Sequence, residues 1–521
     1  MAKEPAKTAN KTGFGTADDD DDFTPPPRDP LHAHPDLCKA NLERLVTDIP
    51  LEIRASNISS GSGLFAGADV EAGREIYNVY PTMKVLEANN DSFCHYCFED
   101  SQPMLGGASK PKQPTKACTG DECKILKKVP QMTAHNLIAH RLLFWQGKGC
   151  ITKPVAKSLM CLESHFNDIT KDPERSTEVL DVAMAVREAT GNKVNLATAW
   201  KLVPLVRVNS VRLRPTSKKE SVGYALDIST ATINHSCDPN AHVFFEGQRL
   251  YVRSLKKIAA GDEITICYLD PTLDVAARKA LLKREYFFDC SCDRCKSELK
   301  EQRSLLGDDT KLPALHQAQR DIISLMGSAV RASKYPGVYP DYDNLATVET
   351  KLRTIMAGAI PPDKTWPEHM EPLPSARLSL AMLYLQQGKP VPALRNALKG
   401  RLFSVRRDIG PDWVNEMVDL VTVCIVAGSL PPDAAALEDK TVPSLEDIRT
   451  VTYGFLLAAC HGALKAFGGD SEYSKGIQEM MGVMVAKRPG VTPGTKEFAA
   501  EFEPAQARVL TWAGVPVKSE S

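Results

Sequence analysis

Three cysteines lie within six residues of the chain, and their spacing constrains the fold more than any other feature. Residues 290–295 read CSCDRC. Zinc takes four ligands, and so tight a spacing lets one turn present several sulfurs to one tetrahedral ion. The fourth ligand must come from elsewhere, and Cys237 is our candidate because it lies in a second unusual segment, NHSCDPN at 234–240. The alternative to a zinc site is that these four cysteines are free thiols.

The segment at 234–240 has two further interpretations. It could be an Asx/Pro turn with a surface histidine. A nucleophilic pair of His235 and Cys237 is the other, but two residues so close in sequence have no defined geometry. Local chemistry alone does not choose between them.

Four more of the fourteen cysteines form two close pairs, Cys94 with Cys97 and Cys118 with Cys123. No apolar segment resembles a signal peptide, and no apolar run approaches the ~18 residues of a membrane span. We therefore expect an intracellular protein, in the nucleus or cytoplasm and not secreted, whose paired cysteines bind metal rather than each other. The formal net charge of −1 gives no overall electrostatic case for binding nucleic acid or membranes.

The rest of the chain divides into regions of different pattern. Residues 1–35 are polar, with an acidic run followed by prolines, and we expect them to be disordered. Short alternating runs predict strands at 51–53, 75–80, 206–208, 241–245, 250–252 and 263–268, with a hairpin turn at 246–248. Helical periodicity predicts helices at 155–169 and 176–189. Helix–turn–helix units beyond residue 310 indicate an α-helical, repeat-like domain.

Five segments taken in order resemble a SET-domain lysine methyltransferase. They read GSGLFA at 61–66, VNS at 208–210, NHSCDPN at 234–240, GDEITICY at 261–268 and YFFDCSCDRC at 286–295. The long insertion between the first two is similar to that of the SET–MYND (SMYD) subfamily. A dinucleotide-binding turn is disfavoured at 61–63, because a second turn and another strand follow where that motif would open a helix.

The resemblance implies an α+β fold with seven parts. We expect a tail at 1–35, the N-terminal part of a SET domain at 50–92, a degenerate MYND-like zinc finger at 93–150, a helical insert at 151–205, the core SET region at 206–270, a zinc-binding post-SET segment at 271–297 and a C-terminal helical domain at 310–521.

The resemblance also assigns site residues. Tyr268 is the expected catalytic residue, and Tyr286 and Phe287 would line the lysine channel. S-adenosylmethionine would contact Gly61, Gly63, Leu64, Phe65, Asn209, Asn234, His235, Tyr268 and Phe288. Cys237 with Cys290, Cys292 and Cys295 matches the post-SET zinc. Cys94, Cys97, Cys118 and Cys123 would hold a second zinc in the finger, where the family's usual second half is missing.

The reaction implied is methyl transfer from S-adenosylmethionine to the side-chain amine of lysine in a protein substrate. The amine must be neutral to attack, and a narrow aromatic channel lowers the lysine pKa from about 10.4 by penalising the charged form. The alternative is a non-catalytic SET-fold interaction protein that acts through the finger and the helical repeats. In both cases we expect protein partners at the helical C-terminal domain.

Overall fold

The computed structural model describes residues 29–87, 133–147, 151–189, 191, 194–216, 221–335, 342, 344–404, 410–431, 433, 439–487 and 492–517. Most of the expected finger at 93–150 lies outside these residues, as do Cys94, Cys97, Cys118 and Cys123. Within the described residues, no helix is both long and apolar enough to cross a bilayer.

Short strands form four small sheets in the first half of the described chain. Three are antiparallel, with the strand orders β1-β2, β3-β9-β8 and β4-β6-β5, and in the fourth β7 runs parallel to β10. The strands are β1 (Leu51–Ala55), β2 (Ser62–Ala66), β3 (Glu75–Val79), β4 (Met83–Leu86), β5 (Val211–Leu213), β6 (Gly223–Leu226), β7 (Asn234–His235), β8 (Ala241–Glu246), β9 (Arg249–Ser254) and β10 (Thr265–Ile266).

Helices precede, interrupt and follow these strands. Those of the first half are η2 (Leu31–Ala33), α1 (Pro35–Leu42), α3 (Ala134–Gly147), α4 (Lys153–Met160), α5 (Phe166–Ile169), α6 (Pro173–Ala189), α7 (Leu196–Asn209) and α8 (Ile228–Ala231). The second half contains α9 (Val275–Tyr286), α10 (Asp293–Leu306), η3 (Asp309–Lys311), α11 (Leu312–Lys334), α13 (Leu345–Ala359), α14 (Leu373–Gln386), α15 (Pro390–Phe403), α16 (Pro411–Gly428), α18 (Leu445–Phe467), α19 (Glu472–Ala486) and α20 (Lys496–Ala513).

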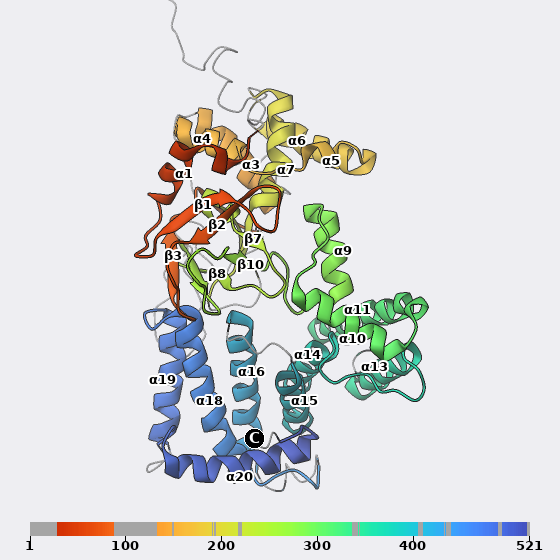
Figure 1. Cartoon of the computed structure of the whole chain (residues 1–521). Coiled ribbons are helices and arrows are strands. Elements are labelled where there is room, and N and C mark those ends of the chain that lie inside the picture. Colours follow the sequence, from red (N-terminus) through yellow and green to blue (C-terminus); the bar gives the residue numbers. More distant parts are fainter. Residues whose placement is uncertain are drawn as a thin grey trace, which may run out of the picture.

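The strands lie between two helical regions (Figure 1). Helices α1 and α3–α7 are above them in this view, α14–α20 are below, and α9–α13 are to one side. The predicted class is confirmed: a β-rich domain with a helical insert precedes an all-helical C-terminal region. The predicted hairpin is also present, with Glu246 opposite Arg249 and Gly247 at φ 53° in the turn.

Two local predictions were wrong, and a third was too long, because only Thr265–Ile266 of the strand predicted at 263–268 forms a strand, β10. Residues 206–208 are not a strand but the last turn of α7, whose buried face runs through Leu202, Leu205 and Val206. Three alternating residues are too few to separate strand from helix, and the periodicity of the preceding turns continues through them. The helix predicted at 155–169 is interrupted between α4 and α5, where His165 adopts the left-handed φ of 50°.

An aromatic contact joins the β-rich domain to the C-terminal helices. Phe244 on β8 belongs to the hydrophobic core of the C-terminal region, and its ring lies 5.4 Å from that of Phe467 at the end of α18. The ring of Tyr251 on β9 stacks on that of Phe244, with the centroids 5.0 Å apart. Burying aromatic rings in this way fixes one domain against the other.

Candidate functional site

Glu263 holds the glycine-containing turn before β2 against strand β7. Its Oε1 accepts hydrogen bonds from Ser56 Oγ and Asn234 Nδ2, both at 2.7 Å, and its Oε2 accepts one from Asn57 N at 2.8 Å. Asn234 Nδ2 also donates to Ser62 O at 3.0 Å. Several donors around one buried carboxylate make strong, charge-assisted bonds. The turn is therefore fixed in position relative to β7.

Gly63 is required by this arrangement. A Cβ on residue 63 would lie 2.5 Å from Glu263 Oε1 and 3.0 Å from the Phe65 ring, whereas a Cβ on Gly61 would meet nothing closer than Ser59 Oγ at 3.9 Å. Contacts that short force the neighbouring side chains to move.

We expect Gly63→Ala to lower the free energy of unfolding by about 1–3 kcal/mol, because the new methyl group displaces Glu263 from its hydrogen bonds. Gly61→Ala is the matched control and should change it by less than about 0.5 kcal/mol. Urea unfolding of both variants measures the difference. Equal stabilities would contradict a tightly packed network at Glu263.

Strands β7 and β10 bring His235 and Tyr268 together. Ile266 pairs with His235, and two residues later the Tyr268 backbone N–H donates to His235 Nδ1 at 3.0 Å. Because Nδ1 accepts, the ring proton lies on Nε2, which faces Cys237 Sγ at 3.2 Å. The Tyr268 hydroxyl donates to Ile233 O at 2.7 Å. Its only proton is thereby used, and the phenol oxygen is left as an acceptor.

Aromatic rings surround Tyr268. Its ring centroid lies 4.8 Å from that of Tyr286 and 5.2 Å from that of His235, which in turn lies 5.8 Å from Phe288. Burial raises the pKa of Tyr286 to about 12 and raises the pKa of Tyr268 above its ordinary value. Both phenols are therefore neutral at physiological pH. Phe287 adopts the left-handed φ of 61° at the end of α9, and its ring contacts His165 at 4.9 Å.

The side-chain amide of Asn209 is committed to the protein itself. At the end of α7 its Nδ2 donates to Glu163 O at 2.6 Å and to Leu205 O at 2.8 Å. The side-chain amide of Asn234 is likewise used within the protein. Both asparagines therefore use their Nδ2 groups to position the segments around the site.

A single cavity of about 2140 Å³ connects most of the predicted residues. Those that line it are Gly61, Asn209, Asn234, His235, Cys237, Tyr268, Tyr286, Phe287 and Phe288. Gly63, Leu64 and Phe65 are not among its lining residues, and the side chains of Leu64 and Phe65 are completely buried. The far wall comes from the C-terminal region, including Asp412, Trp413 and Phe467. The cavity thus lies between the two domains.

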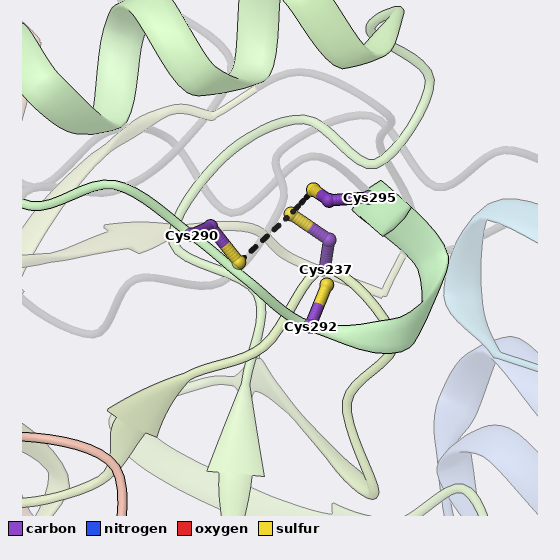
Figure 2. A group of neighbouring side chains, drawn as sticks. All are labelled: Cys237, Cys290, Cys292 and Cys295. Carbon is purple, nitrogen blue, oxygen red and sulfur yellow. Dashed lines mark hydrogen bonds between the residues drawn. The ribbon is translucent and has the colours of Figure 1, made fainter. Parts of the chain in front are cut away.

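Four cysteines predicted to bind zinc converge beside this cavity (Figure 2). The sulfurs of Cys237, Cys290, Cys292 and Cys295 all lie within 4.8 Å of one another, and Cys237 is 3.5 Å from Cys295 and 3.9 Å from Cys290. A tetrahedral zinc with Zn–S bonds of ~2.3 Å separates its sulfurs by ~3.8 Å. The four residues fit a structural zinc site.

The surroundings favour the thiolate form of two of the four cysteines. Hydrogen bonds between the thiols lower the pKa of Cys290 and Cys292 and raise the pKa of Cys237 and Cys295. Cys292 is the N-cap of α10 and Cys295 lies in its first turn, where the helix dipole stabilises negative charge. The fully buried Arg278 places Nη2 3.8 Å from Cys295 Sγ and 2.7 Å from Glu298 Oε2. Its positive charge would compensate part of the negative charge of four thiolates around a zinc ion.

Sequence reasoning missed the roles of Glu263, His165 and Arg278. Glu263 belongs to the quoted GDEITICY segment, but nothing local shows that it bonds Asn234. His165 lies in a region predicted to be one continuous helix, and its contact with Phe287 joins two distant segments. Arg278 is followed by basic residues, a pattern typical of a solvent-exposed helix face. Only its complete burial in the structure shows that it lies beside the cysteine cluster.

Comparison with known proteins agrees with this geometry. The SET domain model matches residues 61–269. The human protein "Histone-lysine N-methyltransferase SMYD3" is 32% identical over 169 residues, which are 32% of this chain and 39% of that protein. Mouse "Histone-lysine N-methyltransferase Smyd1" is 22% identical over 277 residues, covering 48% of this chain and 56% of that protein.

A fungal relative shares the same domain. The Schizosaccharomyces pombe "SET domain and MYND-type zinc finger protein 6" is 29% identical over 182 residues, 34% of this chain and 36% of that protein. These three matches span between 36% and 56% of the relatives' own lengths. The solved structure of Rubisco LSMT bound to sinefungin and monomethyllysine covers 94% of this chain and 97% of that chain at 12% identity, with a TM-score of 0.30 that is too low to indicate a shared fold.

Proposed function

We propose that this chain, which carries a SET domain related to those of the SET–MYND proteins, transfers methyl groups from S-adenosylmethionine to lysine side chains of a protein substrate. One observation carries the proposal. Tyr268, held by His235 and Ile233 O, faces a cavity between the SET domain and the C-terminal helices, with Tyr286 and Phe288 beside it.

Each predicted site residue has a place in this proposal. The turn containing Gly61, with Asn209, Asn234 and His235, frames the cofactor end of the cavity, and Phe288 packs beside it. Tyr286 and Phe287 line the lysine channel. Gly63, Leu64 and Phe65 support the turn from the protein interior rather than by direct contact. Zinc at the four cysteines fastens the post-SET segment to strand β7.

The protein presents a neutral lysine amine in line with the methyl group on the sulfonium of S-adenosylmethionine. The N–C bond forms as the C–S bond breaks, S-adenosylhomocysteine is the leaving group, and the methylated ammonium loses its proton to solvent. Aromatic rings around Tyr268 exclude water and lower the pKa of the entering lysine, because they penalise its charged form. The phenol oxygen of Tyr268 accepts a hydrogen bond from the amine, since its own proton is donated to Ile233 O. This fixes the direction of the nitrogen lone pair. The raised pKa values of both tyrosines exclude a phenolate base at neutral pH.

The pH profile follows from these pKa directions. A phenol with a raised pKa keeps its proton until the pH approaches the raised value, so only the substrate amine changes charge in the usual range. We expect kcat/KM to rise with pH as the substrate amine loses one proton. It should not fall again at any pH below about 10. Initial rates in buffers of constant ionic strength measure it. A bell-shaped profile with a descending limb near neutral pH would contradict this assignment.

The alternative is a SET-fold interaction protein without catalysis. Its support is the degenerate finger predicted at 93–150 and the large helical C-terminal region. Calorimetry with S-adenosylmethionine separates the two proposals. We expect saturable binding of one cofactor per chain, and wild-type protein that binds none would favour the interaction protein.

The substrate enters between the two domains in our proposal. Helix α16 and the end of α18 contribute to the cavity wall, which would bring a bound peptide into contact with the C-terminal region. We further propose that the helical surfaces outside the cavity bind protein partners.

A further inference from the structure

A separate part of the cavity wall is rich in hydrogen-bond acceptors. Helix α10 presents Glu298, Glu301 and Gln302 to the cavity along one face, since residues three and four apart lie on the same side of a helix. Helix α11 contributes Gln319, and Asp274 lies at the start of α9. We call these residues the acceptor wall.

Hydrogen bonds hold the acceptor wall together. Gln302 Oε1 lies 3.1 Å from His316 Nε2, which joins α10 to α11, and one turn later Gln319 Nε2 donates to Glu371 O at 2.9 Å. Glu301 Oε1 lies 2.5 Å from His369 Nε2. The segment before α14 and the two helices thus form one rigid corner of the cavity.

Two oxygens of the acceptor wall have no partner among the described residues. Asp274 is 3% exposed, and its Oδ1 caps α9 by accepting from Ala277 N at 2.9 Å, while its Oδ2 has no donor. Gln319 is fully buried and its Oε1 is also without a donor. A buried carboxylate oxygen without a donor is costly, because nothing replaces the water it has lost.

The charges of this corner favour a cation. Glu298 is balanced by Arg278 and Arg294, which both bond to it at 2.7 Å. No described cation lies within ion-pair distance of Asp274, and Glu301 has only the imidazole of His369. Another part of the cavity wall, from α7 and β5, carries Lys201, Arg207 and Arg212, and Arg207 is paired with Glu178. A cationic side chain in the cavity is therefore attracted to the corner where the carboxylate of Asp274 has no described cation beside it.

We propose that the acceptor wall is a subsite for a second basic residue of the substrate, an arginine or lysine near the lysine that is methylated. A guanidinium or ammonium group has only donors, and it would satisfy Asp274 Oδ2 and Gln319 Oε1 while compensating the excess negative charge. This inference rests on the proposed function, because it assigns part of the same cavity to the substrate peptide.

Peptides that differ by one charge test the subsite. Each peptide has a lysine at a fixed position. A second residue, either arginine or its neutral analogue citrulline, is placed at a different position in each pair of peptides. Binding to the full chain is followed by fluorescence anisotropy, and methylation by transfer of labelled methyl groups. At one or more positions we expect arginine to be preferred by at least about tenfold in both measurements.

Asp274→Asn removes the charge and keeps the cap, because asparagine is as good an N-cap as aspartate. We expect this variant to lose most of the preference for arginine, whereas its binding and methylation of the citrulline peptides should not change. The variant should be at least as stable as the wild type. Glu301→Gln, which keeps an acceptor for His369, should reduce the preference less. Asp308→Asn makes the same change at the cap of η3, outside the cavity, and should have no effect.

The outcomes distinguish failure of the proposed subsite from failure of the proposed function. Methylation without discrimination between arginine and citrulline, or a preference that persists in Asp274→Asn, would overturn the subsite and leave the proposed function intact. Binding of no peptide in the set would also overturn it. A preference in binding that Asp274→Asn removes, without methylation of any peptide, would support the subsite and contradict the proposed function.

Discussion

Tyr268→Phe should reduce methyl transfer to about 1% of wild type or less, while the zinc content stays unchanged. The substitution removes one oxygen, which accepts the hydrogen bond from the substrate amine in our proposal. Losing one such positioned group costs about 100-fold or more in kcat. The ring remains, so its contacts with Tyr286 and His235 are kept. Single-turnover rates with labelled cofactor measure the effect.

Tyr453→Phe provides the matched control. The Tyr453 hydroxyl also donates to a backbone carbonyl, Met484 O at 3.1 Å, but it lies in the C-terminal helices and does not line the cavity. We expect this variant to keep wild-type activity. If Tyr268→Phe were as active as Tyr453→Phe, the phenol oxygen would have no part in the reaction.

Cys292→Ser should remove one zinc ion per chain and lower the free energy of unfolding by at least about 3 kcal/mol. Serine is a favourable N-cap, so α10 keeps its start while the cluster loses a sulfur ligand. The effect should reach the active site, because Cys237 bonds His235 and His235 bonds the backbone of Tyr268. We therefore expect kcat to fall at least about tenfold. Metal analysis, thermal unfolding and activity are the measurements.

Cys460→Ser is the control for this change. Cys460 is also buried, with its thiol 3.7 Å from Ile477 O, but it lies far along the chain in α18 and outside the cluster. It should retain full zinc content. Equal zinc in Cys292→Ser and wild type would mean that the four cysteines are free thiols, which is the alternative that the sequence left open.

The parts of the fold that were predictable from sequence are those fixed by local chemistry. The turn at Gly247 allows the hairpin of β8 and β9, and the spacing of Cys290, Cys292 and Cys295 requires a compact turn. Their partner Cys237 was only a candidate on chemical grounds until the resemblance supported it. The structure then places all four sulfurs together, with the ends of β7 and α10 setting their positions.

The remaining features depend on contacts between distant segments. Residues 206–208 alternate like a strand, yet packing of α7 makes them helical. Glu263 contacts the turn at residues 56–57 across more than two hundred residues of sequence, so no local pattern reveals its role. Likewise Asp274 reads as an ordinary helix cap, and only the tertiary structure shows its second oxygen without a partner.

The most direct test of the proposed function is the identity of the residue that receives the methyl group. Full-length protein is incubated with a cell extract and S-adenosylmethionine carrying a deuterated methyl group, and labelled peptides are identified by mass spectrometry. We predict label on lysine side chains with wild-type protein and none with Tyr268→Phe. Label on no residue, or only on residues other than lysine, would contradict a protein-lysine methyltransferase.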